Sequence, residues 1–140
     1  MEYYDSFRVG ANTAVLREGK ILLGKRKNCF GSGNWGLPGG HLEMKEALID
    51  AAKRELLEET GLVAHTLEFA NVVNDYQREG HHIQFLFVAK SISGEPELRE
   101  PGLCDEWRWF NLENLPENLF IAHKKSIELF KTNTGPFSDS

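Results

Sequence analysis

The sequence has little of what a membrane-bound or secreted protein needs. None of its apolar runs approaches the roughly 20 residues of a membrane-spanning helix. Its start, MEYYDSFRVGANTAVL, has no basic segment before an apolar one, so we expect no signal peptide. Its two cysteines, Cys29 and Cys104, are not spaced as metal ligands. We therefore expect free thiols and a soluble cytoplasmic protein with no membrane partner.

The sequence also lacks an excess of basic residues. It contains 16 Lys and Arg against 21 Asp and Glu, a net charge of −5, which argues against a broad surface for duplex nucleic acid. A phosphate-bearing substrate would therefore have to be bound by a few local cations or by metal ions. The 140 residues suffice for one domain with a single core.

Strand-like and helical segments alternate along residues 1–131, which we expect to form one domain, followed by a flexible tail over residues 132–140. The expected strands are residues 8–16, 21–26, 63–76, 81–90 and 107–112, and the expected helices are residues 46–60 and 120–131. Between them lie turns at 17–20 and 77–80, glycine-containing loops at 28–34 and 37–40, and a long polar loop at 94–106. This order favours an α/β or α+β sandwich over a helical bundle.

The helix predicted over residues 46–60 has an unusual charge distribution. Glu55, Glu58 and Glu59 lie in its last turn and a half, before Gly61, which is expected to end it. Helix carbonyls give that end a negative potential, so carboxylates there are disfavoured. On a helical wheel the three acids span about 100° and border the expected core stripe, where burial raises a carboxyl pKa and neighbouring acids repel one another. The stripe consists of Leu48, Ile49, Ala52 and Leu56.

A bound divalent cation would resolve this conflict, because carboxylate oxygens on neighbouring turns suit Mg²⁺ or Mn²⁺. The alternative is a solvated acidic face, which the paired glutamates alone would favour. The spacing of the whole segment decides between them. It reads Gly40, five residues, Glu46, seven residues, then RELLEETGL over residues 54–62. At average residue frequencies, a chance match to its seven fixed letters is rarer than about one in a million.

This segment, residues 40–62, is similar at every fixed position to the signature of the Nudix hydrolases, the Nudix box. The resemblance extends to LLGKR at 22–26, NWGLPGGHLE at 34–43 and EPGLCDEW at 100–107, which resemble the MutT-like nucleoside-triphosphate branch. It implies an α/β fold, the α/β/α sandwich with a mixed β-sheet and two main helices. It also implies hydrolysis of a nucleoside diphosphate linked to another moiety, with Mg²⁺ or Mn²⁺ as cofactor.

The resemblance also implies roles for individual residues. Those matching the metal-binding positions are Glu55, Glu58, Glu59 and the backbone carbonyl of Gly39. Arg54 matches an arginine that orients the glutamates, and Glu46 matches a structural partner. Glu55 is one candidate for the general base, and Glu100 matches a further ligand or base, although it is also readable as an exposed loop acid. Lys45 stands where the box usually has glycine, so we expect a slightly different entry into the helix.

Weaker candidates for substrate contacts come from the neighbouring loops and strands. Lys25 and Arg26 end a strand and suit phosphate, although surface charges at strand ends are common. His41 follows two glycines and is a candidate either for phosphate contact or for orienting the loop. His82 is a candidate for reaching substrate, a structural role being favoured, and Asn34 for the base pocket. Trp35 and Trp109 are expected to pack in the core.

The leading expectation is cleavage of a (d)NTP, ordinary or oxidised, to the monophosphate and pyrophosphate. The alternatives with the same chemistry are NADH, ADP-ribose, a pterin triphosphate or an RNA 5′ end. A further alternative is a nucleotide sensor without catalysis, but such proteins lose box glutamates and none is missing here. The expected partner is a small-molecule nucleotide, and a homodimer stays open because many family members dimerise.

Overall fold

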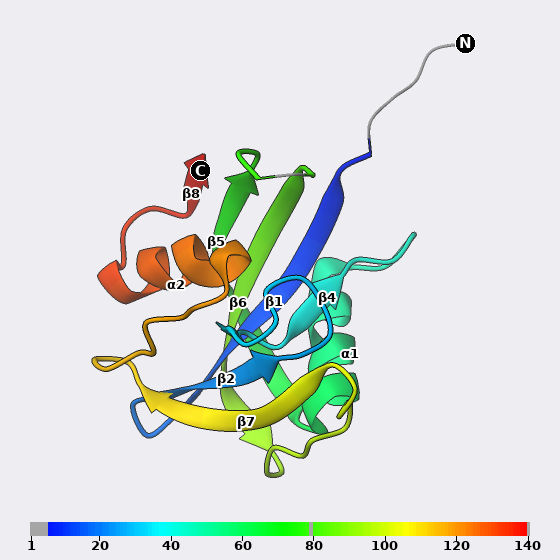
Figure 1. Cartoon of the computed structure of the whole chain (residues 1–140). Helices are drawn as coiled ribbons and strands as arrows, with labels where there is room; N and C mark the ends of the chain where they lie inside the picture. Colours follow the sequence, from blue (N-terminus) through cyan, green and yellow to red (C-terminus); the bar gives the residue numbers. More distant parts are fainter. Residues whose placement is uncertain (1–5, 79, 140) are drawn as a thin grey trace.

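A computed structural model of the chain describes residues 6–78 and 80–139 (Figure 1). Residues 1–5 of the expected domain, residue 79 of the expected turn and residue 140 of the expected tail lie outside the described residues. The elements are β1 (Arg8–Arg17), β2 (Lys20–Arg26), β3 (Trp35–Gly36), β4 (Gly39–His41), α1 (Leu48–Thr60), β5 (Val63–Asp75), β6 (His82–Ser93), β7 (Cys104–Asn111), α2 (Ile121–Thr132) and β8 (Phe137–Asp139).

The strands form one mixed sheet in the order β3-β2-β1-β6-β5-β8, with β4 paired to β1 and β7 paired to β2. β1 is parallel to β6 and antiparallel to β2 and β4. Its residues 10–15 are buried, because it has a neighbour on each edge and a helix-covered layer on each face. β1 is therefore the central strand from which the rest of the sheet is positioned.

The two helices cover opposite faces of the sheet. Alternation along β6 shows this, because Leu86 and Val88 pack in one cluster with Ile127 of α2, whereas Ala89 packs in another with Leu56 of α1. Figure 1 shows α2 and α1 on the two sides of the sheet. The predicted α/β/α sandwich with a mixed sheet is confirmed. Neither described helix is long and apolar enough to cross a bilayer.

The buried face of α1 differs from the predicted stripe. Leu56 and Ala52 are buried as expected, but Ile49 is 42% exposed and Ala51 is buried in its place. The buried arc is therefore rotated toward the row of glutamates, since Ala51 lies one turn before Glu55 on the same side of the helix. Glu55 and Glu59 consequently lie deeper in the molecule than the margin of the core stripe, whereas Glu58 stays exposed.

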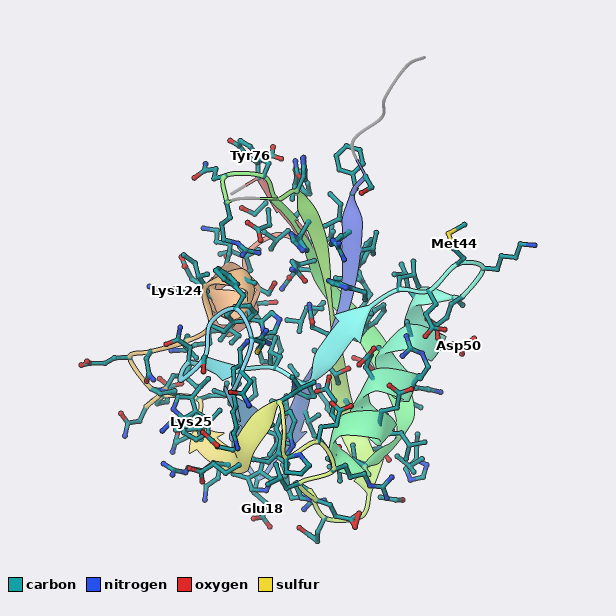
Figure 2. The ribbon with its side chains drawn as sticks, turned by 45° about the vertical axis from the view of Figure 1, so that its right-hand side comes forward. Glu18, Lys25, Met44, Asp50, Tyr76 and Lys124 are labelled. Atoms are coloured by element: carbon teal, nitrogen blue, oxygen red, sulfur yellow. The ribbon has the colours of Figure 1, made fainter. Side chains whose placement is uncertain are left out.

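The entry into α1 also differs from the prediction, because the helix begins at Leu48 and not at Glu46. Residues 43–46 form a turn in which the Glu46 N–H donates to the Glu43 carbonyl, and Lys45 has a left-handed φ of 65°. A residue in that conformation cannot continue a right-handed helix. Figure 2 shows Met44 at the tip of this turn, pointing away from the sheet. The exit is as predicted: Gly61 is left-handed and donates its N–H to the Leu57 carbonyl.

Three short strands were not predicted. β3 and β4 lie where the sequence suggested only a glycine- and proline-rich break. β8 lies in the segment expected to be a flexible tail, and pairs in parallel with β5 from Val72 to Asn74. That expectation is corrected for residues 137–139. Trp35 is buried and Trp109 is partly buried against the α1-side core, as predicted.

Candidate active site

Arg54 joins the first part of the box to the glutamates of α1. Its guanidinium binds both carboxylate oxygens of Glu46, at 2.8 and 3.0 Å, and donates to Glu55 at 2.9 Å and Glu58 at 3.4 Å. It also donates to the backbone carbonyl of His41 at 3.2 Å. These contacts raise the pKa of Arg54, and the hydrogen bond with Glu46 has the largest effect. The same hydrogen bond holds the pKa of Glu46 below its usual value. Arg54 and Glu46 thus link the loop before α1 to the helix.

The three glutamates of α1 differ in their surroundings. The side chain of Glu58 is 50% exposed, whereas that of Glu55 is only 16% exposed. Glu59 is the deepest, and its carboxylate accepts the N–H of Gly39 at 3.4 Å. Burial first, and then the charge of Glu55, raise the pKa of Glu59 well above its ordinary value. The structure therefore places a carboxyl group where a negative charge is unfavourable without a cation.

Gly39 and Gly40 let the backbone of β4 lie directly against these acids. A Cβ on Gly40 would lie 2.3–2.5 Å from the carboxyl atoms of Glu55, so no larger residue fits there without displacing it. The bonded pairs between β1 and β4 flank position 39, since Thr13 donates to Pro38 and Leu42 donates to Val9. Gly39 is therefore a non-bonded position, and its N–H and carbonyl face away from β1, on the side of Glu59.

Glu100 reaches the same place from the opposite side. Its backbone carbonyl accepts the N–H groups of Leu103 and Cys104, and Lys27 anchors this loop by donating to the carbonyl of Pro101 at 3.2 Å. Burial and the charges of Glu55 and Glu58 raise the pKa of Glu100. Glu100 therefore lies at an anchored bend of its loop, on the same cavity as Glu59.

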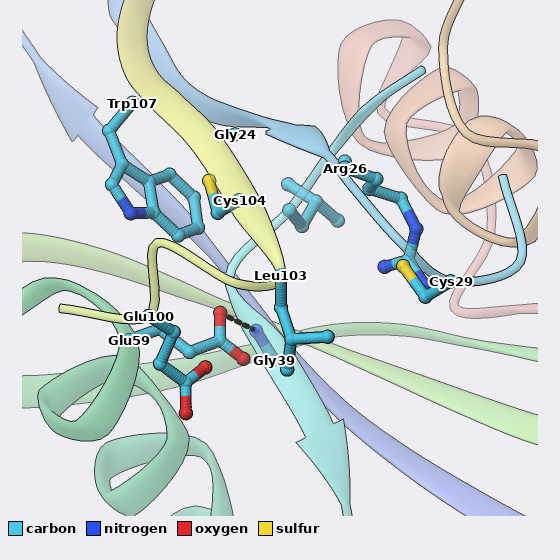
Figure 3. A pocket seen from close by; sticks show the side chains of 11 residues that line it. Gly24, Arg26, Cys29, Gly39, Glu59, Glu100, Leu103, Cys104 and Trp107 are labelled. Carbon is cyan, nitrogen blue, oxygen red and sulfur yellow. Dashed lines mark hydrogen bonds between the residues drawn. The ribbon is translucent and has the colours of Figure 1, made fainter. Parts of the chain in front are cut away.

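Glu59 and Glu100 line a cavity of about 220 Å³ that we call the acidic cavity (Figure 3). Its other walls include Gly39, Cys104 and Trp107, with Gly24 beneath the Trp107 ring: a Cβ there would lie 2.7 Å from it. In the described part of the chain, no three His, Cys, Asp or Glu side chains are arranged closely enough to hold an ion as they stand. Glu55 and Glu58 are instead paired with Arg54.

The donor set nevertheless fits a divalent cation. The carboxylate oxygens of α1 and Glu100 are hard ligands, and burial first, then mutual repulsion, raises the pKa values of Glu59 and Glu100. Gly40 leaves the space that the Glu55 carboxyl group occupies. A cation would relieve that repulsion without any rearrangement of the fold.

A second, larger cavity of about 610 Å³ adjoins the acidic cavity and shares Arg26 and Gly39 with it. We call it the aromatic cavity, because Phe30 and Phe120 form part of its wall. The guanidinium of Arg26 lies 3.8 Å from the centre of the Phe120 ring, and that of Arg78 lies 5.4 Å from the centre of Phe30. Its size falls within the range of about 300–1,000 Å³ typical of ligand pockets.

Comparison with known protein families identifies the family of this chain. The model of the NUDIX domain family fits residues 6–130 of this chain. The chain belongs to the Nudix hydrolase family. The predicted family is confirmed, and with it the α/β/α architecture that the resemblance implied.

Proteins similar to this chain are named for different activities. The ADP-ribose pyrophosphatase of Methanocaldococcus jannaschii is 36% identical over 122 residues, which cover 86% of this chain and 70% of the relative. The oxidized purine nucleoside triphosphate hydrolase of Danio rerio is 36% identical over 106 residues, 73% of this chain and 65% of the relative, so the chain spans slightly less than two thirds of that protein. The crystal structure of a MutT Nudix hydrolase from Burkholderia pseudomallei has a TM-score of 0.83 and 36% identity, covering 89% of this chain and 98% of that one.

The weaker sequence candidates of this Nudix hydrolase separate into two groups. Arg26, His41 and His82 line the aromatic cavity. Burial is the first cause that lowers the pKa of His82. Lys25 and Asn34 line neither cavity among the described residues: Lys25 pairs with Trp35 in the sheet, and the Asn34 carbonyl accepts the N–H of Arg26 within the glycine-rich loop. Their proposed substrate contacts receive no support from their positions.

Sequence reasoning missed much of the Nudix chain's aromatic cavity. Its walls bring Asn12 of β1, Gln84 of β6 and Arg78 together with the first turn of α2, including Phe120 and His123. These residues are far apart in the sequence and share no motif spacing. The partial signal was an amphipathic α2 whose apolar face includes a histidine, which alone indicates only a buried position.

Proposed function

We propose that this Nudix hydrolase cleaves a (d)NTP, ordinary or oxidised, to the monophosphate and pyrophosphate. The observation that carries this proposal is the meeting of the two cavities at Gly39, with carboxylates on one side and an aromatic wall on the other. A nucleotide has the same division, a phosphate chain at one end and a flat base at the other. The similarity to a relative named as an oxidized purine nucleoside triphosphate hydrolase supports this choice.

The acidic cavity would hold Mg²⁺ or Mn²⁺. The residues proposed as ligands are Glu55, Glu58, Glu59, Glu100 and the carbonyl of Gly39. When bound, the metal would offset the phosphate charge and lower the pKa of a coordinated water. Arg54 positions Glu55 and Glu58 through its hydrogen bonds, so we assign it an orienting role.

Proton transfer is assigned to a carboxylate beside the phosphate chain. The attacking water must lose a proton as it adds to phosphorus in line with the leaving group, and a carboxylate within hydrogen-bond reach accepts it. Glu55 and Glu100 are the two candidates. Arg26 lines both cavities, so it is placed to meet the substrate where the phosphate chain joins the nucleoside.

ADP-ribose is the second candidate substrate, and the similarity to the Methanocaldococcus jannaschii relative favours it. The chemistry would be unchanged, but a ribose phosphate would replace pyrophosphate as the leaving product. The acidic cavity would then have to accept a sugar beyond the phosphates.

Product analysis tests the proposal. Purified protein with Mg²⁺ is incubated with ordinary and oxidised (d)NTPs, NADH and ADP-ribose, and phosphate is measured with and without added pyrophosphatase. Phosphate from a (d)NTP that appears only with pyrophosphatase supports the proposal. AMP from ADP-ribose, seen by chromatography without (d)NTP turnover, would favour the second candidate. Nucleotide binding without any turnover would favour a sensor, and a chelator should abolish any activity.

A further inference from the structure

His123, in the first turn of α2, lines the aromatic cavity, and its ring is held in place by several contacts. The side chain is only 5% exposed, yet it forms part of the cavity wall. Its Nδ1 accepts the backbone N–H of Leu37 at 3.0 Å. Gly36 gives the ring its place, because a Cβ on Gly36 would lie 3.1 Å from Nδ1. The Phe120 ring meets it edge to face, with centroids 4.9 Å apart.

The position of the ring proton follows from this contact. Nδ1 accepts a hydrogen bond, so it carries no proton of its own. Burial, with the charges of Arg26 and Arg78 beside it, lowers the pKa of His123 to about 3. The ring is therefore neutral near pH 7 and has its single proton on Nε2. Among the described residues no group accepts that proton. Nε2 itself is not fully buried.

The rest of the aromatic cavity indicates what kind of group would accept it. Phe30 and Phe120 provide flat apolar surface, which suits a base better than a phosphate. No carboxylate lines this cavity in the part of the chain that the structure describes, whereas Arg26 and Arg78 do. The acids that would hold a metal and its phosphates lie instead in the adjoining acidic cavity. The surroundings of His123 therefore suit the base of a nucleotide, whose ring edge carries hydrogen-bond acceptors.

We propose that His123 determines base specificity by donating its Nε2–H to a carbonyl oxygen on the edge of the substrate base, so that oxo bases are preferred over amino bases. The proposal rests on the proposed nucleotide substrate and names its class more narrowly. An amino group at the same place would set one N–H against another and leave a buried donor without an acceptor. The proton on Nε2 cannot move to Nδ1 without breaking the bond from Leu37, so the ring cannot adapt.

The test compares nucleotides that exchange a carbonyl for an amino group at one ring position: ITP with ATP, and UTP with CTP. We expect kcat/KM for the better pair to favour the oxo base about tenfold or more. His123→Asn keeps an oxygen near the Nδ1 position for Leu37 and removes the donor at Nε2. It should bring that ratio close to one, chiefly by lowering kcat/KM of the oxo base. The matched control is Lys124→Asn, an exposed neighbour on α2, which should leave the ratio unchanged.

His123→Gln provides a second variant, because its amide reaches toward the Nε2 position and should keep part of the preference. Binding of IMP and AMP to the unaltered protein, by calorimetry, gives a reading that needs neither a stable variant nor turnover. Equal binding of IMP and AMP together with equal kcat/KM within both pairs would overturn the proposal, as would a preference that persists in His123→Asn. Turnover of nucleoside triphosphates with no such preference would reject the role of His123 but not the proposed function. Absence of all nucleotide turnover would reject the proposed function. Tighter binding of IMP than of AMP would in that case still support the role of His123.

Discussion

Glu59 is the acid whose surroundings most oppose its charge. It is the deepest of the α1 glutamates, faces Glu55 and Glu100, and has only the N–H of Gly39 as a compensating contact in the described structure. Without a cation, the ionised form therefore destabilises the fold. A cation that stabilises the transition state here would therefore also stabilise the folded protein.

Glu59→Gln separates these two effects. We expect kcat with Mg²⁺ to fall by about 10²-fold or more, whereas the metal-free variant should melt at the same temperature as the metal-free protein or higher. The reason is that glutamine keeps the shape of the side chain and removes a buried charge. Steady-state kinetics and metal-free thermal melts check both parts. Normal turnover would refute the metal assignment, and a markedly lower melting temperature would show that the charge stabilises the fold.

Glu100 is distinguished from other acids of its loop by its anchoring. We expect Glu100→Gln to reduce kcat by about tenfold or more, because it faces the acids of α1 across the acidic cavity. Glu97→Gln is the matched control, since its exposed side chain pairs only with Arg99 among the described residues. Equal effects of the two substitutions on kcat would show that Glu100 has no more part in catalysis than another acid of its loop.

Lys45 adopts a backbone conformation that favours glycine. Its φ of 65° and exposed side chain mean that a glycine would relieve strain and lose no contact of note. Lys45→Gly should therefore raise the free energy of unfolding by about 0.5–1 kcal/mol, measured by urea denaturation. Lys53→Gly, in the helical part of α1, should lower it by a similar amount. A loss of stability in Lys45→Gly would show that the lysine side chain contributes an interaction of its own.

At the level of elements, periodic segments were predictable and short ones were not. The alternation of apolar residues indicated β1, β2, β5 and β6, and Gly61 marked the end of α1. β3, β4 and β8 are two or three residues long and exist only because a longer strand is available to pair with them. The start of α1 was misplaced because the turn at Lys45 depends on a conformation that composition does not reveal.

The candidate site divides in the same way. The box glutamates and Arg54 were predictable because one helix and its flanking loops contain them at fixed spacings. The position of Glu100 depends on the long loop folding back onto α1. The aromatic cavity depends on β1, β6 and α2 meeting, and fixed spacings in the sequence do not reveal such contacts. Ile49 was assigned to the core because a wheel drawn from apolar residues alone cannot show that α1 turns the side of Glu55 and Glu59 toward the core.

The buried ring of His123 links α2 to the β3–β4 connection by accepting the N–H of Leu37, and this link should be sensitive to acid. The pKa of His123 is lowered to about 3 in the folded chain, against about 6.5 when unfolded. Its contribution to stability is therefore complete above pH 6.5 and is lost as the pH falls toward 3. Between pH 7 and pH 5 this amounts to about 2 kcal/mol. Chemical denaturation at both pH values should show a loss in the unaltered protein that is smaller by about this amount in His123→Asn; equal losses would contradict it.

At the scale of the whole molecule, charge is separated within an acidic protein. The net charge is −5, yet one cavity contains carboxylates and its neighbour contains two arginines. Gly39 and Arg26 stand at the boundary between them. A nucleotide could lie across this boundary with its phosphates and its base in separate electrostatic surroundings, so each cavity can be altered by mutation largely independently of the other.

The C-terminal segment contributes to the whole sheet. The Val72 N–H donates to the Pro136 carbonyl at 2.8 Å, and Asn74 donates to the Asp139 carboxylate at 2.9 Å. Deleting residues 134–140 should lower the melting temperature by about 5 °C, which differential scanning calorimetry can measure. Asn74→Ala should have a smaller effect, because it removes only the side-chain contact. An unchanged melting temperature in the deletion would show that β8 adds no stability.

β8 also determines what the molecule presents to its copies. Without it, the sheet would end at β5, thirteen residues long and with Phe69 exposed. A long open edge of that kind recruits strands from other chains and begins aggregates. With it, residues 72–74 of that edge are paired, and the strand that covers them ends in an aspartate. Residues 137–139 thus limit aggregation through the sheet edge. An enzyme shortened there should precipitate at high concentration even though its catalytic groups are intact.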